Sequence, residues 1–167
     1  MNQNQVLLLS LLRAALFGEK LDASAFAETN WKQILRLADI LTISALALDG
    51  MGMLPTSALR MPLSEKLSHI GKMQRLEQVN MLHRCVIVKI DKALKAEGIP
   101  VVFMKGQTTA LRYSNPLHRT PGDIDFVVDP KDFKKTMEVL EKIGKVDHGL
   151  VHEHHGMGRW SDGGASL

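Results

Sequence analysis

The sequence predicts an α+β fold, in which a helical N-terminal region, residues 1–98, precedes a small core, residues 99–167, with a short mixed sheet. Up to Gly98, apolar residues recur at spacings of three and four, which is the period of an amphipathic helix. After Gly98, a short apolar run at 100–104 and a segment at 123–128 that alternates acidic with apolar residues before becoming apolar are typical of strands. The 167 residues are 45% hydrophobic and 23% charged, a balance that excludes a disordered or collagen-like chain.

Two helices are predicted before residue 50. The first covers residues 5–17, because its apolar residues share one helical face and Gly18 is a natural stop. The second begins after Asn30, which can cap it with Gln33 three residues later, and continues to about Leu48. Two glycines and a proline then break the chain before residue 56.

The longest periodic segment predicts a single helix over 64–97 that ends at Gly98. Its apolar residues recur at threes and fours, which predicts a stripe facing the core. The stripe consists of Leu67, Ile70, Met73, Leu82, Val86, Ile90 and Leu94.

The core is predicted from two strands and two helices. Residues 100–104 are almost continuously apolar, as in a strand buried on both faces, and a turn at 105–107 leads into a short helix at 108–113. The second strand covers 123–128. Asp129 can cap a further helix, with Pro130 at its first position and its end at Gly144.

Residues 145–167 are rich in glycine and histidine and show no clear period, so no element is predicted there. Residues 161–167 offer neither a helix cap nor a convincing strand. We therefore expect the core to be incomplete at its C-terminus, in an element that a longer parent chain would complete.

Charge and cysteine content limit the function classes. The 21 Lys+Arg and 18 Asp+Glu residues give a formal charge of +3, too little to infer a nucleic-acid partner. The single cysteine, Cys85, cannot form an internal disulfide and is expected to be a buried thiol. The apolar opening at 6–12 lacks a preceding positive residue and is far shorter than a span of roughly 20 residues. We expect a cytoplasmic protein with no membrane partner.

The most informative feature is the pair Asp123 and Asp125. Side chains alternate faces along a strand, so the two carboxylates would share one face, with Cβ atoms about 7 Å apart. Carboxylates at that separation repel each other unless a cation lies between them, and Mg²⁺ prefers such oxygen ligands. The pair predicts a divalent metal, whereas a bare Asp-x-Asp in any sequence more often marks a solvated strand end.

Upstream of this pair, a strand runs into Lys105-Gly106 and a short helix, an arrangement that suits phosphate. A glycine lets the backbone approach closely, and the amides at a helix N-terminus are unsatisfied donors. Lys105 and Arg119 could contact phosphates, or could merely balance the charge of the two aspartates.

These residues together resemble a known family. The motifs are Phe103-Met104-Lys105-Gly106, then Arg119, then Gly122-Asp123-Ile124-Asp125-Phe126-Val127-Val128. They are similar to the uncharacterised bacterial nucleotidyltransferase-like family within the DNA polymerase beta-type nucleotidyltransferase superfamily. In that superfamily a glycine motif at the start of the first core helix precedes an acidic pair on the next strand.

The resemblance implies a transferase that moves a nucleoside monophosphate from ATP or another nucleoside triphosphate to a hydroxyl of a small molecule, a protein or an RNA. Asp123 and Asp125 would be the catalytic residues and would hold Mg²⁺ or Mn²⁺. The superfamily usually has glycine or serine after the motif glycine, whereas this chain has Gln107. The nucleotide-binding residues would be Lys105, Gly106, Gln107, Arg119 and Gly122.

Active superfamily members carry a third carboxylate on a later strand. Glu153 and Asp162 are the only acidic residues after Asp147, so the third acid is one of these, lies beyond Leu167 or is absent. Its absence would imply an alternative function: a catalytically inactive nucleotide-sensing or protein-interaction module on the same fold, with the helix at 64–97 as its partner surface.

A histidine cluster offers a competing site. His148 and His152 have a helix-like spacing of four, which could chelate zinc, and His154 and His155 follow closely. Neighbouring glycines weaken any helix there, and short histidine clusters are often solvated loops. The resemblance suggests another role for this segment, as part of the wall of the nucleotide pocket.

Overall fold

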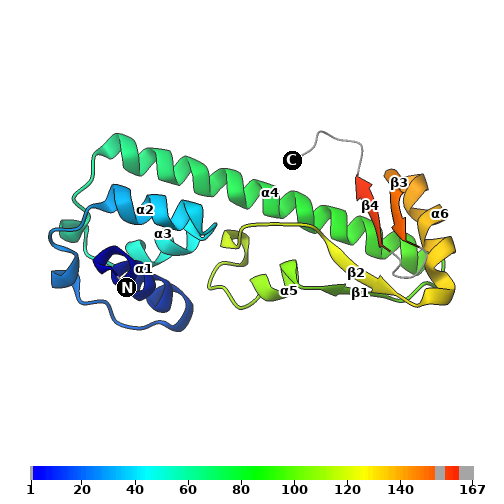
Figure 1. Ribbon diagram of the computed structural model, residues 1–167, viewed down its shortest axis with the longest axis horizontal. Helices are drawn as coiled ribbons and strands as arrows, with labels where there is room; N and C mark the ends of the chain where they lie inside the picture. Colours follow the sequence, from blue (N-terminus) through cyan, green and yellow to red (C-terminus); the bar gives the residue numbers. More distant parts are fainter. Residues whose placement is uncertain (1, 153–156, 162–167) are drawn as a thin grey trace. The chain divides into compact units, whose positions relative to one another are not determined.

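The computed structural model describes residues 2–152 and 157–161 (Figure 1). It is an α+β structure, mostly helical, in which the described strands form two separate two-stranded antiparallel sheets. The chain divides into two compact units. Unit 1 comprises Met1–Asn80 and Thr109–Pro121, and unit 2 comprises Met81–Thr108 and Gly122–Leu167. The helix α4 (Leu63–Ala96) contributes to both.

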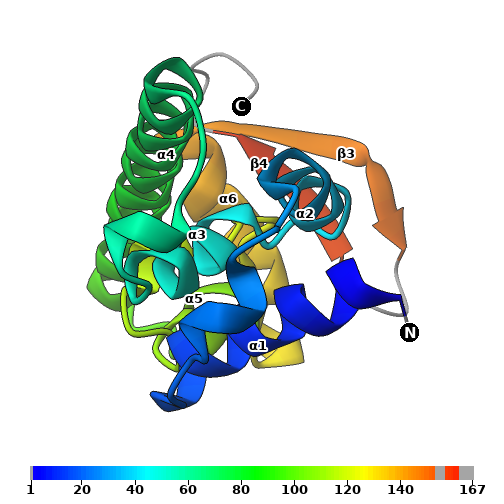
Figure 2. The ribbon, with the colours of Figure 1, turned by 90° about the vertical axis from the view of Figure 1, so that its left-hand side faces the viewer.

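Three helices of unit 1, α1 (Gln3–Phe17), α2 (Trp31–Ile40) and α3 (Ser44–Gly52), pack against one another (Figure 2). The predicted end of α1 is confirmed, since Gly18 adopts φ 68° and its N–H donates to the carbonyl of Ala14. The core of this unit also contains Phe26, whose ring stacks on Trp31 with centroids 5.6 Å apart. Its buried residues are Leu7, Leu8, Leu11, Phe26, Trp31, Ile34, Leu35, Ala38, Ala47, Met51, Leu54 and Ala58.

The single helix predicted from Asn30 to about Leu48 is wrong, because α2 and α3 are separate. Asn30 does cap α2, and its side chain accepts from the N–H of Gln33. However, Thr42 adopts φ 57°, a conformation that a β-branched residue rarely takes and that ends an α-helix. The N–H of Ile43 then donates to the carbonyl of Ala38, which closes α2 before α3 begins.

The long helix predicted at 64–97 is confirmed as α4, but its apolar stripe is only partly buried. Ile90 and Leu94 are 1% and 0% exposed, whereas Leu67 and Ile70 are 58% and 51% exposed. The first part of α4 adds no side chain to the apolar cluster of unit 1. Cys85 is exposed, so the predicted buried thiol is wrong. Within the described residues no helix has both the length and the apolar character needed to cross a membrane.

Unit 2 contains the strands β1 (Val101–Met104) and β2 (Asp125–Val128), with Val101 opposite Val128 and Met104 opposite Asp125. The predicted mixed sheet is wrong, because this pair and the pair described below are both antiparallel. Parallel neighbours are usually joined by a long helix that returns along the strand, whereas residues 105–124 contain only the five-residue helix α5 and a short turn at Pro116–His118.

Only one face of the β1–β2 sheet packs on the core of unit 2. The inner face contributes Val101, Phe103, Phe126 and Val128 to an apolar cluster with α4 and α6 (Phe133–Ile143). On the outer face, Val102 and Val127 are 63% and 47% exposed, so the prediction of burial on both faces is wrong. The fully buried members of the cluster are Ile90, Leu94, Ile99, Val139 and Leu140.

The strands β3 (Lys145–His152) and β4 (Met157–Ser161) form the second antiparallel pair, in a region where no element was predicted. Lys145 lies opposite Ser161 and His152 opposite Met157, but the register is irregular between Asp147 and His152. That irregularity breaks the period-two pattern from which a strand is predicted. The division into domains at residue 98 stays a prediction.

Candidate functional site

The chain makes a tight turn where β1 ends and α5 (Gly106–Ala110) begins, at the position of the predicted glycine turn. Lys105 and Gly106 both have positive φ, 50° and 26°. The carbonyl of Lys105 accepts two hydrogen bonds from Thr108, one from its N–H at 2.8 Å and one from its hydroxyl at 2.6 Å. These bonds close the turn, and they start the helix two residues before the predicted position.

Gly106 lies next to the acidic segment. A Cβ atom placed on Gly106 would be 3.6 Å from the backbone oxygen of Asp123, with no closer atom. The glycine turn and the backbone of the acidic segment therefore lie close together within unit 2, with little more than the space of one methyl group between them.

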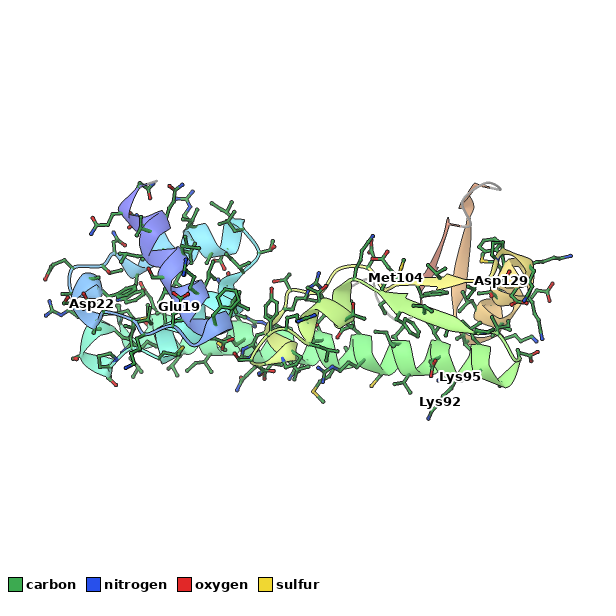
Figure 3. The ribbon with its side chains drawn as sticks, turned by 90° about the horizontal axis from the view of Figure 1, so that it is seen from below. Glu19, Asp22, Lys92, Lys95, Met104 and Asp129 are labelled. Atoms are coloured by element: carbon green, nitrogen blue, oxygen red, sulfur yellow. The ribbon has the colours of Figure 1, made fainter. Side chains whose placement is uncertain are left out.

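The two aspartates occupy different local structures. Asp125 is the first residue of β2 and lies opposite Met104, on the outer face of the sheet (Figure 3, in which Met104 is labelled). Asp123 precedes the strand and is exposed. Alternation along a strand, on which the shared face was predicted, therefore applies to Asp125 and not to Asp123.

Lys105 forms an ion pair with Asp125. Its Nζ lies 3.8 Å from Oδ2 of the aspartate, and the two side chains are 74% and 41% exposed. An exposed pair of this kind contributes only about 0–1 kcal/mol to stability. Both groups can therefore exchange this contact for another at small cost.

Three further predicted residues lie in this part of the sequence. Gln107 is half-buried in the first turn of α5. Gly122 is exposed, and a Cβ placed on it would meet nothing within 4 Å. Arg119 belongs to unit 1, where its Nη1 donates to the carbonyl of Thr120 at 3.1 Å.

Several polar contacts that the sequence did not indicate hold the segment 114–120 within unit 1. The hydroxyl of Ser114 donates to the carbonyl of Ala15 at 2.6 Å, and the hydroxyl of Thr120 donates to the carbonyl of Thr42 at 2.5 Å. Asn80 donates through Nδ2 to two carbonyls of the same segment. These partners are remote in sequence, so no local pattern could have indicated them.

The carboxylates suit a hard cation that brings ligands of its own. Among the described residues, no three His, Cys, Asp or Glu side chains gather to hold a metal ion. Mg²⁺ is commonly bound through one or two carboxylates together with waters and phosphate oxygens. Two aspartates next to a glycine turn therefore fit a Mg²⁺ or Mn²⁺ ion that arrives with a polyphosphate, and they do not fit an all-protein cage.

The remaining candidates for a metal or an acid lie mostly outside the described residues. Glu153 and Asp162, the proposed third acids, fall there, as do His154 and His155. His148 and His152 lie on the strand β3, so the helical spacing from which zinc binding was predicted is wrong. A zinc site in this segment stays a prediction.

Comparison with known proteins supplies the family. A family model described as an uncharacterised nucleotidyltransferase matches residues 27–165. The chain belongs to this uncharacterised nucleotidyltransferase family. This match confirms the family that the sequence motifs resemble. The matched residues of this nucleotidyltransferase family member include both the Lys105–Gly106 turn and the acidic pair. Searches of curated proteins and of solved structures found no match.

Proposed function

We propose that this chain binds a nucleoside triphosphate together with Mg²⁺ or Mn²⁺ and transfers the nucleoside monophosphate to a hydroxyl acceptor. The closeness of Gly106 to the backbone of Asp123, in a member of a nucleotidyltransferase family, carries the proposal. The ion pair between Lys105 and Asp125 supports a site in which a turn suited to phosphate and carboxylates suited to a divalent cation act together.

The phosphate half of the site consists of the turn and its lysine. The small glycine leaves the backbone open to a phosphate group, and Gln107 of α5 and Gly122, which directly precedes Asp123, would complete this half of the site. Lys105 is 74% exposed and only weakly held by Asp125, so its ammonium group can turn to a phosphate oxygen. The contact of Arg119 with phosphate, expected from the sequence, stays a prediction.

The cation half of the site consists of Asp123 and Asp125. A bound divalent cation would supply charge neutralisation at the phosphates and at the leaving pyrophosphate. The protein groups hold and orient the triphosphate: the turn contacts its phosphates, and the carboxylates fix the side from which the cation approaches. Orientation of this kind is the main protein contribution to phosphoryl-type transfers.

The proposed reaction is a displacement at the α-phosphorus. The acceptor hydroxyl oxygen forms a bond to the α-phosphorus, and the bond from that phosphorus to the oxygen bridging to the β-phosphate breaks. The electron pair of the broken bond leaves on pyrophosphate, and the hydroxyl proton passes to water. The acceptor, whether a small molecule, a protein or an RNA, ends as the nucleoside monophosphate ester.

A thermal-shift titration with ATP, GTP, CTP and UTP, each with and without Mg²⁺, tests the proposal. A ligand at one hundred times its Kd stabilises the native state by about 2.7 kcal/mol, which is a Tm rise of about 5–10 °C in a domain of this size. We expect one or more triphosphates to raise the Tm only with Mg²⁺, and a double variant, Asp123→Asn with Asp125→Asn, to lose the effect.

A matched control removes a carboxylate elsewhere in unit 2. Asp129 follows β2, forms an ion pair with Lys131 at 3.2 Å and caps a short turn (Figure 3). Asp129→Asn should keep the nucleotide response. If no triphosphate shifts the wild-type protein, the proposal is wrong; if a triphosphate binds but pyrophosphate is never released with candidate acceptors, the inactive nucleotide-sensing module replaces it.

A further inference from the structure

The outer face of the β1–β2 sheet carries three exposed apolar side chains. Val102, Met104 and Val127 are 63%, 41% and 47% exposed. Val102 and Val127 lie opposite each other on the two strands, so their Cβ atoms are about 5 Å apart. Met104 lies on the same face, two residues further along β1 (Figure 3). We call these three residues the apolar patch. Single exposed apolar residues are ordinary, whereas three that adjoin form a continuous surface.

The apolar patch adjoins the cation half of the proposed site. Met104 is the direct cross-strand partner of Asp125, and Val127 follows Asp125 by two residues on the same face of β2. At a rise of about 3.3 Å per residue, the backbone positions of Asp125 and Val127 are about 7 Å apart. All of these residues belong to unit 2. A ligand that lies along this face therefore meets a carboxylate at one end and apolar side chains at the other.

A nucleoside triphosphate is divided in the same way. Its phosphates are charged, whereas its base has flat faces that pack well on apolar side chains. The proposed function puts the phosphates at the turn of Lys105 and Gly106, directly after the end of β1. The outer face of the sheet begins at that turn, so the nucleoside joined to the phosphates has apolar surface next to it.

The size of the apolar patch favours a nucleobase over a protein partner. The patch extends about 5 Å across the two strands and about 7 Å along them. A stable protein interface buries about 800 Å² on each partner, far more than three side chains offer. One face of a planar base covers a surface of this size, and the removal of that apolar area from water is favourable.

We propose that the apolar patch binds the nucleobase of the triphosphate, whose ring face packs on Val102, Met104 and Val127. This inference rests on the proposed function and deepens it by giving the nucleoside a binding surface. The two valines carry no hydrogen-bonding group in their side chains, so they contact the face of a base without reading its edges. We therefore expect all four triphosphates to bind, with ATP and GTP tighter than CTP and UTP, because a purine covers more apolar area.

A comparison of two ligands, one with a base and one without, tests the proposal. The Kd values of the Mg²⁺ complexes of ATP and of inorganic tripolyphosphate are measured by calorimetry, for the full-length wild type and for a double variant, Val102→Thr with Val127→Thr. Threonine keeps the β-branched shape that suits a strand. We expect the double variant to bind ATP about fivefold more weakly, because two methyl groups under the base become hydroxyls. Its affinity for tripolyphosphate should not change.

Val88→Thr in α4 is the matched control, since Val88 is also in unit 2 and is 49% exposed, close to the 47% of Val127. It should leave the affinity for both ligands unchanged. Circular dichroism checks that the double variant is folded. If it is not, Val102→Thr alone takes its place, because Val102 is the more exposed of the two valines at 63%.

The outcomes separate this inference from the proposed function. An unchanged affinity for ATP in the folded patch variant, an equal loss for both ligands, or an equal loss in Val88→Thr would each overturn the base-binding patch while the phosphate and cation halves stand. A wild type that binds ATP no more tightly than tripolyphosphate would do the same. If the wild type binds neither ligand with Mg²⁺, the proposed function is wrong and this inference fails with it.

Discussion

A single methyl group added at Gly50 should lower the unfolding free energy of unit 1. It lies in α3 against the backbone of α1, and a Cβ placed on it would be 2.3 Å from the oxygen of Leu11, 2.7 Å from its carbonyl carbon and 2.9 Å from its Cα. All three atoms are main chain, so no side-chain rotation can relieve the contact. Gly50→Ala must therefore move one helix away from the other.

The size of the effect follows from that distance. Ordinary contact begins at 3.4 Å, so the gap must open by 1.1 Å, which is 3.4 minus 2.3. A gap of 0.5–1 Å already forfeits roughly a quarter to a half of each dispersion contact across it. Overpacking of this kind costs about 1–3 kcal/mol, and the gain in helix propensity from Gly to Ala returns up to about 1 kcal/mol. We expect an overpacking cost of about 3 kcal/mol, which the gain in helix propensity reduces to a net loss of stability of about 2 kcal/mol.

Urea unfolding followed by circular dichroism measures this loss as a fall in the midpoint at an unchanged slope. Gly71→Ala in α4 is the matched control, since a Cβ placed there meets nothing within 4 Å. That substitution should stabilise by about 0.5–1 kcal/mol. If Gly50→Ala unfolds at the wild-type midpoint or above it, the close contact between α1 and α3 is refuted.

Other substitutions test the site, the second core and one carboxylate. Gly106→Ala and Gly98→Ala each force a side chain to positive φ, 26° and 71°, and should each destabilise by about 1–2 kcal/mol in urea unfolding. Only Gly106→Ala should also reduce the Tm response to a triphosphate with Mg²⁺; equal losses in both variants would contradict the phosphate turn. Leu94→Ala empties a fully buried position and should cost about 2–5 kcal/mol, and a smaller loss by the same assay would mean that the site is not packed as described. The pKa of Asp39 is raised by burial, but the hydrogen bonds from a serine hydroxyl and from Lys72 outweigh this and hold it below its ordinary value. Its stabilising effect is therefore present above the ordinary carboxyl pKa and is lost as the pH falls through the lowered one, so Asp39→Asn should flatten the acid limb of a pH titration of unfolding free energy.

The elements predicted well are those with local signals at both ends. Gly18 stops α1, and Gly98 follows the end of α4, as the sequence indicates. The break between α2 and α3 could not be predicted, because Thr42 has no turn-forming chemistry and its left-handed backbone is stabilised by contacts with other parts of unit 1. Strand direction was missed for a similar reason, since pairing is decided by partners far along the chain.

The candidate site was likewise only partly predictable from the sequence. The order of strand, glycine turn, helix and acidic motif is local, and the structure brings Gly106 against Asp123 as that order suggests. The contacts of His118 in unit 1 could not be predicted from the sequence, because its partners Asp49 and Glu77 are 69 and 41 residues away. The sequence around a histidine in a loop does not indicate which carboxylates contact it in the folded protein.

The division of the chain into units has a consequence for the order in which the protein can be made. Unit 1 is interrupted by residues 81–108 and is completed only by residues 109–121. During synthesis, α1, α2 and α3 leave the ribosome early and can pack on one another at once. Asp49 and Glu77 leave it before His118, so their contacts with that imidazole form late. A chain ending at residue 108 should therefore contain the apolar core of unit 1 in folded form, while the carboxylates of Asp49 and Glu77 are still hydrated in place of their contacts with His118.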